Sequence, residues 1–106
     1  DPDRHGDDIR AICLERTAPL EAADVEVFLQ LLMLQTGPNL LRLKGILGLV
    51  DTPEQPLLVH AVQHVVHEPL TLDGWPGTDR STRIVLIVKG AVPGAIEQLF
   101  AQLTAG

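Results

Sequence analysis

Residues 40–50 constrain the fold more than any other part of the chain, because they alternate as a β-strand with one buried face does. Read as a strand, the segment places leucines on one face and mostly cations on the other: Leu41, Leu43, Leu47 and Leu49 opposite Arg42, Lys44 and Ile46. Two charges in mid-strand are costly to bury. We therefore expect the leucine face to lie under helices and the cationic face to be open.

The rest of the chain predicts five more elements around this strand. In chain order they are a strand at 9–16, a helix at about 22–35, a hairpin partner strand at about 57–67, a strand at 83–89 after a long loop at 68–82, and a helix from Pro93 through Leu103. This βαβββα order predicts an α+β domain with a four-stranded sheet and two helices packed on one face. The strand order stays open. Residues 1–8 are interpreted as a linker, and residues 9–106 as one domain.

The first helix is too apolar for a helix that buries only one side. One stripe contains Val25, Phe28, Leu29 and Leu32, and a second stripe beside it contains Val27, Leu31 and Leu34. In a domain of two layers, one side of such a helix stays open. We favour the interpretation that a partner absent from this chain covers Val27, Leu31 and Leu34, over unusually deep burial of the whole helix.

Composition limits the function classes that remain. The chain has 106 residues, a formal net charge of −6 and only three aromatic side chains, Phe28, Trp75 and Phe100. An acidic chain without a basic stripe or an aromatic platform is a poor candidate for binding nucleic acid. No apolar run reaches the length that spans a membrane, so we expect no membrane partner. The single cysteine, Cys13, rules out an internal disulfide and indicates a cytoplasmic protein.

The motifs of catalysis are missing from these residues. The sequence contains no G-x-x-x-x-G-K-[ST] phosphate loop, no G-x-S-x-G elbow, no H-E-x-x-H and no C-x-x-C. Nothing in the spacing pairs Cys13 with a histidine base, and a strand cysteine usually packs as a small hydrophobe. We therefore expect this chain not to be an enzyme and to hold no cofactor by itself.

Three histidines are close enough in the sequence to be considered as metal ligands: His60, His64 and His67. On one continuous strand, His60 and His64 would be about 13 Å apart, and His67 would face the other side. Zinc bonds nitrogen at about 2 Å, so the three cannot form a site alone. The favoured interpretation is histidines on a half-solvated strand. The alternative is that they join ligands from elsewhere, with Cys13 as a further candidate and zinc or cobalt as the metal.

Arg42, Lys44 and Trp75 are the remaining candidates for contact with a partner. The two cations either pair with local acids such as Glu15 or Glu68, or they dock against a partner surface or a phosphate-bearing ligand. Trp75 lies between Gly74 and Pro76 in the long loop. It is interpreted first as a loop anchor and second as an interface residue, since tryptophan is common at the centre of interfaces.

Segments from Arg4 to Leu103 resemble the C-terminal domain of the CobW-like P-loop GTPases, a family associated with metal delivery and cobalamin biosynthesis. The resemblance rests on the order and spacing of several segments: Arg4–Arg10, Leu41–Gly45, Val62-Gln63, Trp75-Pro76 and Arg80 through Ile87. It implies that a GTPase domain precedes this one and carries GTP, magnesium and a cysteine-rich metal motif.

The resemblance implies that this chain is a non-catalytic interaction or regulatory module. It would dock with the N-terminal GTPase domain of the same protein, or with a metal-dependent client protein. The expected contact residues are Val27, Leu31, Leu34, Arg42, Lys44 and Trp75. The alternative function is a metal-binding domain that uses His60, His64 and His67 in an assembled site.

Overall fold

The fold is a single antiparallel sheet with two helices on one side, seen in a computed structural model that describes residues 8–63, 65–90 and 94–105. Its elements in chain order are β1 (Ile9–Arg16), α1 (Ala22–Thr36), the 3-10 turn η2 (Gly37–Asn39), β2 (Leu40–Leu47), β3 (Leu57–Val62), β4 (Val65–Val66), β5 (Leu70–Thr71), β6 (Thr82–Lys89) and α2 (Ala95–Leu103). The α+β class and both helices agree with the sequence prediction. Most of the predicted linker, His64 and Pro93 lie outside the described residues.

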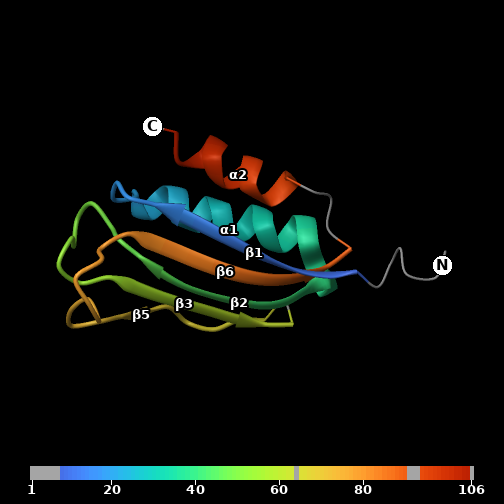
Figure 1. The fold of residues 1–106 in the computed structure, drawn as a ribbon, viewed down its shortest axis with the longest axis horizontal. Helices are drawn as coiled ribbons and strands as arrows, with labels where there is room; N and C mark the ends of the chain where they lie inside the picture. The colour runs from blue at the N-terminus through green and yellow to red at the C-terminus, as the bar shows by residue number, and fades with distance from the viewer. Residues whose placement is uncertain (1–7, 64, 91–93, 106) are drawn as a thin grey trace.

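Strand β6 is an interior strand of the sheet, next to the edge strand β1, in the order β1-β6-β2-β3-β4, with β5 paired to β3 (Figure 1). All of these strand pairings are antiparallel. The hairpin predicted between the second and third strands is present, because Lys44 pairs with His60 across β2 and β3. The first two strands are not neighbours, since the last strand of the chain is inserted between them.

The prediction of four strands was wrong, because the third strand is shorter than expected and the sheet has six strands. Gln63 takes a positive φ of 49°, and the chain reverses after Val62. Val65 then pairs with Val62 in β4, and Leu70 pairs with Leu58 in β5 inside the segment predicted as a loop. The turn was not predicted because residues 57–67 contain no glycine, proline, asparagine or aspartate, the residues that usually mark a turn.

A register shift in β2 changes which leucines are buried. The shift lies between Leu40 and Arg42, where β2 pairs with β6. Leu40 is fully buried, and Leu41 is only half-buried, so Leu40 takes the place predicted for Leu41. After the shift the alternation returns, with Leu43 and Leu47 buried and Arg42 and Lys44 exposed.

The core fills the space between the sheet and the helices, and it is almost wholly aliphatic. Its buried side chains are Ile12, Leu14, Leu20, Val25, Phe28, Leu32, Leu40, Leu43, Leu47, Val59, Ala61, Ile84, Leu86, Val88, Ile96 and Phe100. The two helices meet through Phe28 and Phe100, whose rings lie edge to face with centroids 5.3 Å apart. Arg16 reaches from β1 to donate to the carbonyl of Thr104 just after α2. These contacts hold both helices on the same face of the sheet.

No helix in the described part of the chain is long and apolar enough to cross a membrane.

We expect Gly45→Ala to destabilise the domain by about 1–3 kcal/mol, because it overpacks the core at the centre of β2. A Cβ at this position would lie 2.9 Å from Cγ1 of Ile84 and 3.1 Å from Cγ2 of Val59. Urea unfolding followed by circular dichroism measures the change in the free energy of unfolding. Gly77→Ala is the control, since a Cβ there has no atom within 4 Å. Equal stability of the two variants would contradict the close packing described here.

Candidate interaction surfaces

The second apolar stripe of α1 is exposed on the outer side of the helix layer. Val27 is 42% exposed, Leu31 39% and Leu34 82%. A shallow hollow of about 490 Å³ lies beside the stripe, lined by Gln30, Met33, Leu34 and Gly37. The first stripe behaves oppositely, because Val25, Phe28 and Leu32 are buried against the sheet. One helix therefore contributes to the core on one side and offers an apolar surface on the other.

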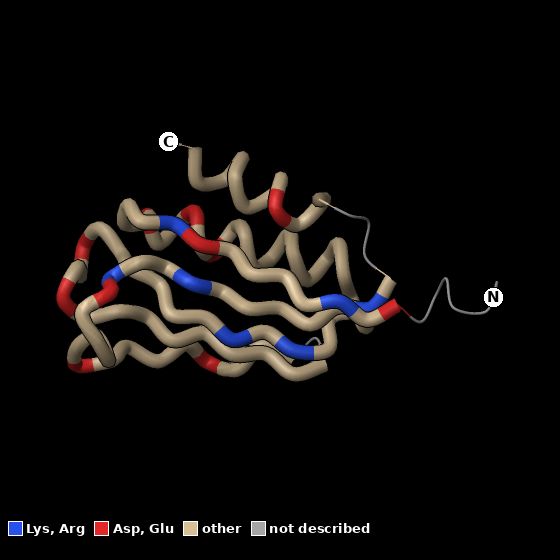
Figure 2. The backbone as a smooth tube through the Cα atoms, viewed as in Figure 1, with Lys and Arg blue, Asp and Glu red and all other residues tan. Residues whose placement is uncertain are grey.

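Charge is unevenly divided between the two faces of the domain. Neither α1 nor α2 contains a lysine or an arginine, while the acids Asp24, Glu26 and Glu97 lie on these helices. Apart from Arg80 in the loop before β6, the blue positions in Figure 2 lie on strands, and β2 and β6 carry two each. The chain is acidic as a whole, so the cations of the sheet stand out from the rest of the molecule.

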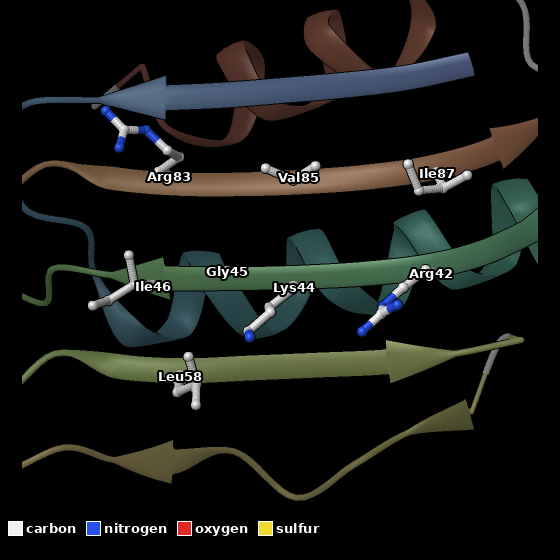
Figure 3. Close-up of a pocket in the computed structure, with 8 residues that line it drawn as sticks. All are labelled: Arg42, Lys44, Gly45, Ile46, Leu58, Arg83, Val85 and Ile87. Atoms are coloured by element: carbon white, nitrogen blue, oxygen red, sulfur yellow. The ribbon is translucent and has the colours of Figure 1, made fainter.

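The face of the sheet that the helices do not cover has a shallow apolar groove of about 440 Å³ (Figure 3). Both helices lie behind the sheet in this view, and the groove faces the viewer. Its lining residues come from the three neighbouring strands β6, β2 and β3: Arg42, Lys44, Gly45, Ile46, Leu58, Arg83, Val85 and Ile87. We call these eight residues the open-face groove. Because side chains alternate along a strand, the even-numbered side chains of β2 from Arg42 onward and the odd-numbered side chains of β6 lie on this face, and the others enter the core.

The three cations of the open-face groove differ in their partners. Arg83 forms ion pairs with Glu15 and Asp79, each with a nitrogen–oxygen distance of 3.4 Å. The backbone N–H of Ser81 donates to Asp79 over 2.9 Å, and this bond lowers the pKa of Asp79, as do the Ser81 hydroxyl and Arg83. Arg42 and Lys44 are exposed and form no ion pair with any residue in the described ranges.

The expectation that Glu15 neutralises Arg42 or Lys44 was therefore wrong. Glu15 lies on β1 directly opposite Arg83 of β6, and its carboxylate is held there. Two strands lie between β1 and β3, so Glu15 is remote from the side of β2 toward which Arg42 and Lys44 lean (Figure 3). The charge of these two side chains is left for solvent or for a partner.

Trp75 anchors its loop at one end of the same face. Its indole N–H donates to the carbonyl of Pro53 over 2.9 Å. A Cβ at Gly48 would lie 3.3 Å from the indole ring, so the ring covers the glycine that follows β2. Arg80 and Glu54 form an ion pair between the same two loops. A second hollow of about 320 Å³ along Trp75 shares Ile46 and Arg83 with the open-face groove, so the anchor also borders the exposed surface.

The fold-back after Val62 brings two of the three candidate metal ligands together. The rings of His60 and His67 are stacked with centroids 5.0 Å apart and planes 14° apart. The N–H of His67 also donates to the carbonyl of His60 over 2.9 Å. The expectation that His67 faces away from His60 was wrong, because it assumed one continuous strand. His64 lies outside the described residues, and within them no three histidine, cysteine or acidic side chains converge as a metal site.

Cys13 is an exposed residue of β1 and does not pack as the small hydrophobe that was expected of a strand cysteine. It lies on the same side of the strand as Ala11 and Glu15, whereas Ile12 and Leu14 enter the core. Its thiol lies 3.8 Å from a carboxylate oxygen of Glu15 and is far along the sheet from the histidine pair. Cys13 therefore forms no common site with His60 and His67 in the described part of the chain.

The sequence analysis placed Arg42 and Lys44 correctly on an open face but missed the apolar residues beside them. Leu58, Val85 and Ile87 share that face because their strands pair in register with β2, as Lys44 does with Val85. Alternation within residues 83–89 could have separated Val85 and Ile87 from the core residues. Their position beside the cations depends on β6 lying next to β2, which no local pattern specifies.

Comparison with known proteins assigns the family of this fold. A family model described as the cobalamin synthesis protein cobW C-terminal domain matches residues 9–104. The crystal structure of the Zn(II)-bound YjiA GTPase from E. coli is similar, with a TM-score of 0.79 and 27% identity, over 91% of this chain and 30% of that chain. A Zn(II)-bound triple mutant of the YjiA GTPase matches with the same TM-score and identity, over 92% of this chain and 30% of that chain.

A comparison with curated proteins gives no match. The chain spans less than a third of the length of the two solved chains. The family match covers every described strand and helix, from the start of β1 to the end of α2. The protein belongs to the CobW C-terminal domain family.

Proposed function

We propose that this chain is the non-catalytic C-terminal module of a CobW-like GTPase and that it acts by docking on the GTPase domain of the same protein. The family description and the 30% coverage of the YjiA GTPase support this proposal. In such a protein, GTP and magnesium bind the preceding domain, and this module responds to its nucleotide state. The single cysteine is in keeping with a cytoplasmic location.

The exposed stripe of α1 is the observation that carries the proposal. Leu34, at 82% exposure, is the most exposed of the large hydrophobic side chains that the structure describes. An uncharged apolar stripe suits a contact between domains that are covalently joined, because it requires little desolvation of charge. Val27, Leu31 and Leu34 together form this contact.

The position of the stripe also suits a contact with a preceding domain. The C-terminal end of α1 leads through η2 directly into Leu40 of β2. Leu40 pairs with Val88, and Val88 pairs with Arg10 near the start of β1. Leu34 therefore lies toward the end of the sheet at which the chain enters β1 (Figure 1). A domain that precedes β1 meets this end first.

Docking on this stripe links nucleotide state to the exposure of a metal or client surface. If the GTP and GDP forms of the GTPase domain bind the stripe with different affinity, the nucleotide shifts the population between docked and undocked arrangements. The difference in binding free energy between the two forms sets the size of that shift. The docked arrangement covers a surface that the undocked arrangement presents to the client.

We expect Leu34→Asp to weaken binding of this chain to its GTPase domain by about tenfold or more, because a buried leucine contributes about 1.5–3 kcal/mol. Isothermal titration calorimetry measures binding with GDP and with a non-hydrolysable GTP analogue. Leu70→Asp is the matched control, since Leu70 is 59% exposed on β5, far from α1. The proposal fails if the wild-type chain binds the GTPase domain in neither nucleotide state, or if Leu70→Asp weakens binding as much.

The contact between His60 and His67 favours metal binding as a second candidate function. Rotation of both side chains from the stacked arrangement would bring a nitrogen of each ring within about 2.0–2.1 Å of one zinc or cobalt ion. Further ligands would come from His64, from a second copy or from the GTPase domain. The zinc named for the YjiA structures belongs to those proteins.

For this candidate we expect His60→Ala and His67→Ala each to lower zinc affinity at least tenfold, because each removes one of two adjacent ligands. Competition with a chromophoric chelator at neutral pH, with reductant present, measures the affinity. Cobalt absorption spectra report the coordination geometry. His5→Ala is the control. An unchanged affinity in both variants would exclude a site at this pair.

A further inference from the structure

We propose that the open-face groove is a second docking site and that its occupant is an acidic amphipathic helix of a partner protein. The site goes beyond docking through α1 and does not depend on it, because the groove and the stripe lie on opposite faces of the domain. The module would thus hold its own GTPase domain with the helix layer and a separate protein with the sheet.

The open-face groove runs along the strands. In Figure 3, Arg42 and Lys44 lean from β2 toward β3, while Val85 and Ile87 project from β6. Gly45 has no side chain, and its backbone forms part of the lining between the two rows. The open-face groove therefore has an apolar side along β6 and a cationic side along β2. Ile46 and Leu58 add apolar surface at one end of it. A ligand that fits must itself have one apolar and one anionic side.

The unpaired cations of the groove favour a partner with negative charge. Arg42 and Lys44 are exposed without an ion pair among the described residues, whereas Arg83 at the end of the open-face groove is already paired with Glu15 and Asp79. Two free cations beside apolar side chains gain from carboxylates brought close to them, and they repel a basic surface. Two cations on a chain of net charge −6 are too few for the phosphate backbone of a nucleic acid.

The spacing of the two cations fits a helix. Arg42 and Lys44 are two residues apart on a strand, which separates them by about 6.6 Å. Carboxylates four residues apart on a helix are separated along the axis by about 6 Å. Glutamates at i and i+4 therefore meet both cations, and the neighbouring apolar stripe of the same helix meets Val85 and Ile87. The covered face of this sheet already packs against two helices, through their apolar side chains.

The test uses a synthetic helix of about 18 residues, whose length of about 27 Å matches an eight-residue strand. It has one leucine stripe flanked by glutamates at every fourth position, and a matched peptide has lysines instead. We expect the glutamate peptide to bind the wild-type chain, with NMR shifts at Val85 and Ile87, and to bind less tightly as salt rises. The double variant Arg42→Glu, Lys44→Glu should lose at least tenfold in affinity for it and should gain affinity for the lysine peptide.

Leu34→Asp is the control on the opposite face and should leave peptide binding unchanged, with circular dichroism confirming the fold of every variant. The inference is overturned if the wild-type chain prefers the lysine peptide, or if the charge reversal does not exchange the preference. It is also overturned if sedimentation shows self-association that the double variant abolishes, since a second copy would then occupy the groove. Loss of GTPase-domain binding in the double variant, with Leu34→Asp unaffected, would assign the groove to the GTPase domain and overturn both proposals.

Discussion

The pairing of β6 between β1 and β2 is the constraint on which the rest of the structure depends. β6 is an interior strand of the sheet, and its side chains Ile84, Leu86 and Val88 are all fully buried under the helices. Its other side chains, Arg83, Val85 and Ile87, lie on the face of the sheet that the helices do not cover. Because β6 comes late in the chain, the sheet cannot be completed until nearly all of the sequence is present.

This interior strand also explains why the domain has two distinct surfaces. Each strand beside it buries one set of side chains and presents the other, so a covered face on one side requires an uncovered face on the other. The helices bury the covered face, and α1 has more apolar surface than that task needs. Both proposed contacts, one on α1 and one on the open-face groove, would therefore leave the core undisturbed.

Much of the fold could be predicted from local patterns, and the candidate surfaces only in part. The alternation of residues 40–50, the apolar run at 83–89 and the doubly apolar first helix are visible in the sequence, and so was the exposure of Arg42 and Lys44. The end of β3 could not be predicted, because Gln63 adopts a left-handed conformation that glutamine seldom takes. The shift from Leu41 to Leu40 could not be predicted either, since a bulge in β2 reflects its pairing with β6.

The sequence by itself determined the class of the domain, its aliphatic core and the two apolar stripes of α1, because all of these depend on residue type and short-range periodicity. The order and spacing of several segments also carried the resemblance to its family. Only the tertiary structure decided that Val85 and Ile87 lie beside Lys44 and Arg42, that His67 stacks on His60, and that Glu15 is held by Arg83. These neighbours are tens of residues apart or separated by a turn of unusual conformation. Their proximity comes from strand order and register, which are set by how the whole sheet closes over one core and not by any segment alone.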